Sequence, residues 1–190
     1  VILGIGQGQV TWSPLLAANA YATLARGGRV LDPIVVRGDV PSERRPPRDL
    51  YLDQESVEMA LRGLWRGVND DIGTSHEISY EDELPAEPVF TIDGIAVWGK
   101  SGTAQPPLGF DLDRDGVLDD LEKTLRPDHS WWVGLAGPER PGSTKGEPAF
   151  AIAVLVEHGG SGGRVGGPIA AQVIRALQYH GYLPGRRSRD

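Results

Sequence analysis

The sequence predicts an α+β fold, in which strands that are antiparallel neighbours are combined with helices. β-Branched and aromatic residues gather in residues 90–105, 130–136 and 149–157, a composition typical of strands. The long connections between these stretches fit antiparallel pairing. One further short strand is expected at 34–36, inside a proline-rich connection.

Capping residues and apolar periodicity predict three helices. Ser13 can cap a helix that has Pro14 at its first position, and Asp53 can cap the next one. A last helix is expected to begin around Pro168. Apolar residues recur on one side of the second and third helices and are expected to face the core. They are Val57, Ala60, Leu61, Leu64, Trp65 and Val68 in the second helix, and Ile169, Val173, Ala176 and Leu177 in the third, with His180 at the core edge.

Length and charge narrow the class of protein. A chain of 190 residues suits one domain or one large piece of a bigger one. The net charge of −7 arises in two acidic segments, residues 70–87 and 111–122, and the remaining surface is mildly basic. No basic stripe with interleaved aromatic residues is present, so nucleic acid is not expected as a partner. Neither a signal peptide nor a membrane helix is expected within this chain, because its longest apolar run is short.

The strand predicted at 90–105 ends in a group of residues with binding chemistry. Lys100 is expected where the strand meets solvent, and Gly99 and Gly102 would let another backbone approach closely. An edge strand of this kind can accept an extended peptide as one more strand. Ser101 and Thr103 would offer hydroxyl donors to a carboxylate or a developing oxyanion. On spacing alone, the alternative is a solvated turn at the end of a strand.

Four ordered stretches resemble one known family. Residues 97–105 resemble the lysine-serine/threonine-glycine box of the penicillin-binding proteins, the D,D-transpeptidases that cross-link peptidoglycan. Residues 4–22, 129–136 and 151–170 resemble the segments that precede and follow this box. The chain is most similar to the class B group, the penicillin-binding protein 2-like enzymes. The resemblance implies an antiparallel sheet covered by helices, of the serine β-lactamase and transpeptidase type.

The family's nucleophile is missing from this chain. No serine is followed by a lysine three residues later, and the serine-x-asparagine motif is also absent. In the family both motifs precede the segment seen near the start of this chain. We therefore expect residues 1–190 to be a single piece, the C-terminal part of a transpeptidase domain, with 106–128 as an acidic insertion. The isolated chain is expected to be inactive.

The resemblance also implies roles for the residues of the box. Lys100 and Thr103 would be catalytic, and the terminal carboxylate of a stem peptide or of a β-lactam would be bound by this segment. The implied partners are peptidoglycan stem peptides, β-lactams and the remaining N-terminal part of the domain, on the periplasmic side of a bacterial inner membrane. The implied substrate-binding residues are Lys100, Ser101, Gly102 and Thr103.

A second candidate site lies in the acidic segment. Residues 111–122 satisfy the calcium-loop pattern, with Gly116 at the sharp turn. The alternative is an acidic solvated loop with a chance match. If calcium binds, its role would be structural, and a competing function for the chain is a non-catalytic, calcium-dependent binding or scaffold module. The predicted ligands are Asp111, Asp113, Asp115, Val117, Asp119 and Glu122.

Overall fold

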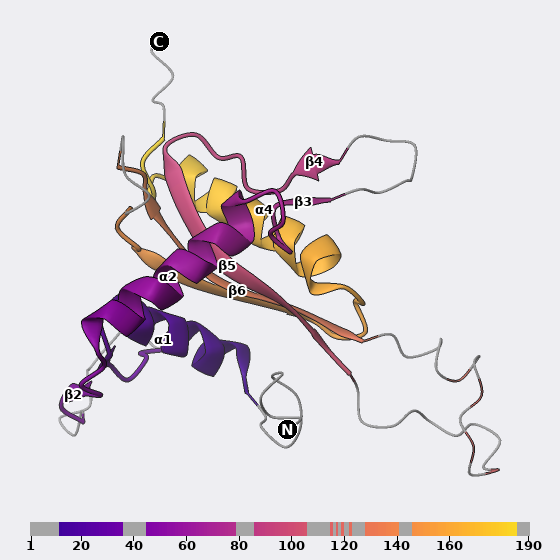
Figure 1. Ribbon diagram of the computed structural model, residues 1–190, viewed down its shortest axis with the longest axis horizontal. Helices are drawn as coiled ribbons and strands as arrows, with labels where there is room; N and C mark the ends of the chain where they lie inside the picture. Colours follow the sequence, from indigo (N-terminus) through magenta and orange to yellow (C-terminus); the bar gives the residue numbers. More distant parts are fainter. Residues whose placement is uncertain are drawn as a thin grey trace.

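The computed structural model describes residues 12–35, 45–78, 86–105, 115, 117, 119, 122, 128–140 and 146–185. A three-stranded sheet lies at its centre, and two small two-stranded ribbons lie outside it (Figure 1). In chain order the elements are α1 (Pro14–Ala25), β1 (Arg29–Val30), β2 (Arg48–Asp49), α2 (Gln54–Asn69), β3 (Glu77–Ile78), β4 (Glu87–Pro88), β5 (Ile95–Ala104), β6 (His129–Pro138), β7 (Phe150–Val156), the short π-helical turn η2 (Gly162–Gly166) and α4 (Gly167–Tyr179).

The central sheet confirms the predicted antiparallel strands. Its order is β5-β6-β7, with Lys100 opposite Val133 and Gly134 opposite Ile152. β5 begins later than its apolar composition predicts, because a turn with Gly94 at φ 72° precedes it. The α+β fold predicted from the sequence is therefore correct.

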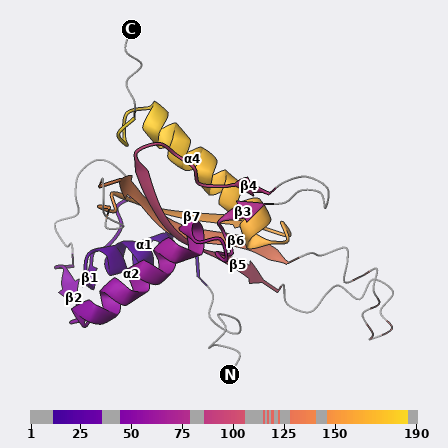
Figure 2. The same ribbon diagram turned by 45° about the horizontal axis from the view of Figure 1, so that its top comes forward.

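Helices cover both faces of the sheet. Figure 2 shows α4 on one face and α1 and α2 on the other. The core on the α4 side joins Ala170 and Ile174 to Val97 and Trp132, none of which is more than 2% exposed. Side chains that alternate along β5 thus serve two layers, as a pleated strand requires.

Trp132 is the largest fully buried side chain of the described core. Its indole stacks on the ring of Phe90, with 4.9 Å between centroids. Gly99 and Gly134 make room for it, since a Cβ added at either residue would lie 2.2 or 2.3 Å from its ring atoms. The glycine before Lys100 therefore has a packing role as well as leaving the strand edge open.

The predicted helix starts are confirmed. Ser13 Oγ accepts the Leu16 N–H at 3.3 Å, and an Asp53 carboxylate oxygen accepts the Ser56 N–H at 2.9 Å. Hydrogen bonds from Ser56 hold the pKa of Asp53 below its ordinary value. Within the part of the chain that the structure describes, no helix is both long enough and apolar enough to span a membrane.

The predicted core face of α4 is wrong for most of its residues. The buried residues include Ala170, Ala171 and Ile174, whereas Ile169 and Val173 are more than a third exposed, and of the predicted stripe Leu177 packs partly buried against the core. Small alanines let α4 approach the sheet closely, and hydropathy alone does not report this. His180 follows α4 as an exposed cap residue and does not lie at the core edge.

The two remaining predictions concern α2 and residues 34–36. In the predicted α2 stripe Val57 and Val68 are buried, Leu61, Leu64 and Trp65 are half-buried, and only Ala60 is exposed. Of the predicted strand at 34–36, Ile34 and Val35 are in no strand and are 59% and 80% exposed, and residue 36 lies outside the described residues. Nearby pairing occurs instead between β1 and β2, where Arg29 lies opposite Asp49.

Candidate functional site

Lys100 lies where β5 leaves the core and reaches solvent, as predicted. Its side chain is exposed, and its ammonium group donates to the carbonyl oxygen of Ser101 at 2.7 Å. Because β5 is at the edge of the described sheet, only β6 pairs with it there. The other edge of β5 is therefore the side on which an extended ligand can lie.

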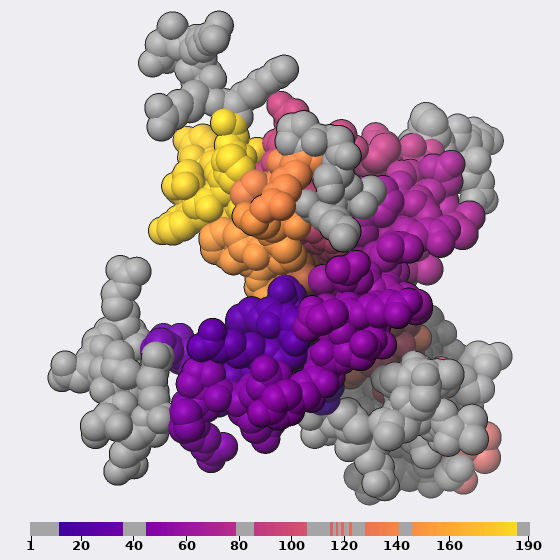
Figure 3. Space-filling model, turned by 60° about the vertical axis from the view of Figure 1, so that its left-hand side comes forward, coloured from indigo at the N-terminus to yellow at the C-terminus, as the bar shows by residue number. Residues whose placement is uncertain are grey.

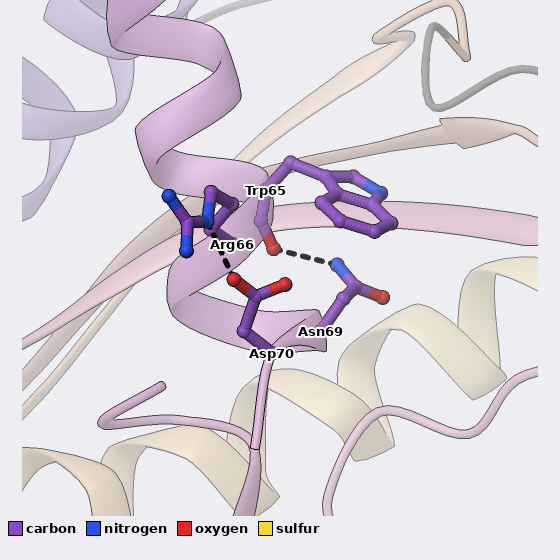
Figure 4. Close-up of polar contacts among 4 residues, drawn as sticks. All are labelled: Trp65, Arg66, Asn69 and Asp70. Atoms are coloured by element: carbon purple, nitrogen blue, oxygen red, sulfur yellow. Dashed lines mark hydrogen bonds and ion pairs between the residues drawn. The ribbon is translucent and has the colours of Figure 1, made fainter. Parts of the chain in front are cut away.

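Asn69 identifies which backbone groups face this outer edge. Its side-chain amide donates to the carbonyl oxygens of Trp65 (2.7 Å; Figure 4) and of Val97 (3.1 Å), and so joins the end of α2 to β5. Residues of an antiparallel strand direct their backbone groups alternately to the two sides. Because the Val97 carbonyl points outward, the backbone N–H and C=O of Ser101 and Thr103 point outward as well.

Two hydroxyl groups complete this stretch of strand, and each has a partner from another segment. Ser101 Oγ donates to Thr74 Oγ1 at 2.8 Å, in the loop that follows α2. Thr103 Oγ1 accepts the backbone N–H of Gly162 at 3.3 Å. A hydroxyl that accepts one hydrogen bond keeps its own proton to donate. Thr103 is thus held in a state that can donate to a ligand.

The turn η2 packs tightly against the same stretch. A Cβ added at Gly162 would lie 2.2 Å from the carbonyl oxygen of Gly102, and one added at Gly163 would lie 2.5 Å from that of Thr74. Only glycine permits such close backbone approach. Three segments, the end of β5, the loop after α2 and η2, therefore meet at Ser101, Gly102 and Thr103.

The arrangement suits a ligand with a carboxylate. It offers one exposed ammonium group, the Thr103 hydroxyl, which keeps its proton, and an outward-facing backbone N–H, all of which stabilise negative charge, whereas the Ser101 hydroxyl donates its proton to Thr74. The structure brings Lys100, Ser101, Gly102 and Thr103 together, as consecutive residues of one strand must be. Sequence reasoning missed Thr74 and Gly162, for which the only local signals were a Gly-Thr pair and a glycine run.

The acidic segment is described at only four of its predicted ligands. Asp119 Oδ1 accepts the Glu122 N–H at 2.8 Å, and Glu122 Oε2 accepts the Asp119 N–H at 3.1 Å. This reciprocal pair is a capping box, in which both carboxylates bind backbone. Asp115 and Val117 are also described, whereas Asp111 and Asp113 lie outside the described residues. Among the described residues, no three His, Cys, Asp or Glu side chains are grouped to hold a metal.

A cavity of about 470 Å³ lies between α2, the end of α1 and β5, and its lining includes Trp65 and Trp98. The predicted core stripe of α2 therefore lines a cavity along part of its length. Arg66 and Asp70, which form an ion pair at 2.5 Å, also line it (Figure 4). Figure 3 shows α1 and α2 as one indigo and purple surface beside the orange surface of the last strands.

Comparison with known proteins gives a consistent family. Residues 2–175 match the family described as the penicillin-binding protein transpeptidase domain. The chain is 29% identical over 183 residues to the peptidoglycan D,D-transpeptidase MrdA of Haemophilus influenzae, covering 92% of this chain and 25% of that protein. It is 28% identical over 178 residues to the peptidoglycan D,D-transpeptidase PbpA of Mycobacterium tuberculosis, covering 90% of this chain and 30% of that protein.

A solved structure has the same fold. Penicillin-binding protein A from M. tuberculosis, in its acyl-enzyme complex with ceftriaxone, superposes with a TM-score of 0.60 at 23% identity. The match covers 92% of this chain and 34% of that one. The chain thus spans about a quarter to a third of the length of these relatives.

Proposed function

Since the chain belongs to the transpeptidase domain family of penicillin-binding proteins, we propose that it is the C-terminal part of a class B peptidoglycan D,D-transpeptidase and forms one wall of its active site. The observation that carries the proposal is the outer edge of β5. There the exposed Lys100 is followed by the Thr103 hydroxyl, which keeps its proton, and by a backbone N–H on the side of β5 that β6 does not pair. This is the geometry that receives an extended peptide ending in a carboxylate.

Each residue of the box has a role in this proposal. The Thr103 hydroxyl donates to the terminal carboxylate of a D-alanyl-D-alanine stem peptide or of a β-lactam, and Ser101 joins it by turning its hydroxyl proton from Thr74 Oγ1 to the ligand. Gly102 lets the ligand backbone come close to the strand. The Thr103 N–H is one donor of the oxyanion hole, a contact whose loss typically costs about 3–4 kcal/mol in the transition state. Lys100 contributes positive charge to the proton-transfer network around the nucleophile.

The attacking hydroxyl belongs to a part of the domain outside this chain. A serine attacks the carbonyl carbon of the penultimate D-alanine, the terminal D-alanine leaves, and an acyl-enzyme forms. The amine of a neighbouring stem peptide then takes the acyl group and releases the serine. The partners are therefore the stem peptides, β-lactams and the remaining N-terminal part of the domain. The reaction takes place on the periplasmic side of the inner membrane.

Labelling with a fluorescent penicillin tests the proposal. A longer protein that includes the preceding part of the domain is expected to take up covalent label that survives boiling. Residues 1–190 alone are expected to take up none. A longer protein that stays unlabelled favours the non-catalytic, calcium-dependent scaffold. A labelled serine within residues 1–190 contradicts the placement of the nucleophile.

A further inference from the structure

One buried hydroxyl outside the Lys100 stretch makes two long-range hydrogen bonds. Ser130 lies in β6 directly opposite Thr103, and none of its surface is exposed. Its Oγ donates to the carbonyl oxygen of Ser161 at 3.1 Å and accepts the backbone N–H of Gly166 at 3.0 Å. Both partners are more than thirty residues away in the sequence.

These two partners lie at the two ends of η2. Ser161 precedes the turn, and Gly166 is its last residue, where α4 takes over. The Gly166 N–H has Ser130 as its partner, so the serine satisfies a buried donor where one kind of helix changes into another. The Ser130 hydroxyl thereby holds both ends of residues 161–166 against β6.

The position of η2 in turn sets the direction in which the Thr103 hydroxyl proton points. The Gly162 N–H donates to Thr103 Oγ1, and a Cβ at Gly162 would meet the Gly102 carbonyl oxygen at 2.2 Å. While this donor is in place, the Thr103 hydroxyl is held as an acceptor toward η2 and as a donor toward the strand edge. If η2 moved away, the hydroxyl could rotate and turn its proton elsewhere.

Two further hydrogen bonds hold the chain just before η2. The His158 N–H donates to His129 Nδ1 at 3.0 Å, and the Gly160 N–H donates to the Asp128 carbonyl oxygen at 2.7 Å. They fix the chain before the turn. Within η2, Gly162 donates to Thr103 Oγ1 and Gly166 donates to Ser130 Oγ, and Ser130 also binds the carbonyl oxygen of Ser161.

We propose that Ser130 is a positioning residue for the active site, because it clamps η2 and through Gly162 keeps the Thr103 hydroxyl directed at the substrate carboxylate. The inference rests on the proposed function in one respect, namely that Thr103 binds this carboxylate. Ser130 itself touches no substrate.

The test uses the longer protein, with Ser130→Ala, Ser130→Cys and a matched control, Ser75→Ala. Ser75 is equally buried at 1% exposed, but its Oγ has no hydrogen-bond partner among the described residues. Hydrogen exchange of a peptide covering residues 158–167 is expected to be faster in both Ser130 variants and unchanged in the control. The rate constant for acylation by a fluorescent penicillin is expected to fall about tenfold in both Ser130 variants, as for a lost buried hydrogen bond.

A double-mutant cycle separates positioning from general stability. Thr103→Val removes the hydroxyl that Ser130 is proposed to direct, so Ser130→Ala is expected to cost no further acylation rate in that background. Additive losses, or unchanged exchange in both Ser130 variants, overturn the proposal. If the wild-type longer protein takes up no label, the proposed function fails, and the exchange measurement still decides whether Ser130 holds η2.

Discussion

A single methyl group at Gly162 should push η2 away from strands β5 and β6. A Cβ there would lie 2.2 Å from the Gly102 carbonyl oxygen, 2.4 Å from the Trp131 carbonyl oxygen and 2.7 Å from the Gly102 nitrogen. Ordinary carbon–oxygen contacts are about 3.3–3.6 Å, so η2 must move by roughly 1 Å. All three atoms are backbone in paired strands, and no side chain can rotate aside to relieve the overlap.

Gly162→Ala is therefore expected to cost about 2–3 kcal/mol of unfolding free energy, the upper part of the range for overpacking. Gly63→Ala is the matched control, because Gly63 is exposed in α2 and no atom outside its own helix lies within 4 Å of the added Cβ. That substitution should stabilise the protein by up to about 1 kcal/mol through helix propensity. Urea unfolding followed by tryptophan fluorescence measures both changes.

The reasoning would be refuted by a Gly162→Ala protein as stable as the wild type, since η2 would then have space that the structure denies it. A destabilised Gly63→Ala protein would show that the loss at Gly162 reflects any alanine in place of glycine. Labelling by fluorescent penicillin adds a second readout in the longer protein. There Gly162→Ala should lose labelling as the Gly162 N–H withdraws from Thr103 Oγ1.

Three further predictions concern the core, the cap of α2 and the acidic segment. Trp132→Ala should cost about 3–5 kcal/mol, whereas Trp132→Phe should cost much less in urea unfolding, because the buried indole N–H has no partner among the described residues. Because the pKa of Asp53 is lowered in the folded protein, its carboxylate stabilises the fold above the unfolded pKa of about 3.9, and this stabilisation is lost as the pH falls through the folded pKa. The melting temperature of the wild type should therefore converge on that of Asp53→Asn in acid. A difference that stays constant with pH would contradict this. Millimolar calcium tests the acidic segment: a rise in the melting temperature of the wild type that Asp113→Ala abolishes would indicate a calcium site, and no rise in either protein would leave an acidic loop without a metal.

The strands could be predicted from the sequence because their evidence is local. Apolar and β-branched residues mark β5, β6 and β7 in the sequence itself, and neighbours in the chain are neighbours in the sheet. The buried face of α4 could not be predicted in the same way. Hydropathy ranks Ile169 and Val173 above Ala170, but α4 packs against the bulky Trp132, and close approach there requires small residues. The residue that decides the helix face is thus in another element.

The candidate site likewise contains residues that a local pattern indicates and residues that only the fold brings in. Lys100, Ser101, Gly102 and Thr103 could be proposed as a site because they are consecutive and their order suggests binding chemistry. Their supports could not, because each is a single residue brought in by the fold: Thr74 from the loop after α2, Gly162 from η2, and Ser130 from the neighbouring strand. The partner of the Thr103 hydroxyl, the Gly162 N–H, is 59 residues away, so no local sequence pattern indicates the contact. It follows that two chains with the same Lys-Ser-Gly-Thr stretch can still differ in how firmly Thr103 is directed, and that the difference will lie in residues such as Ser130 that no motif includes.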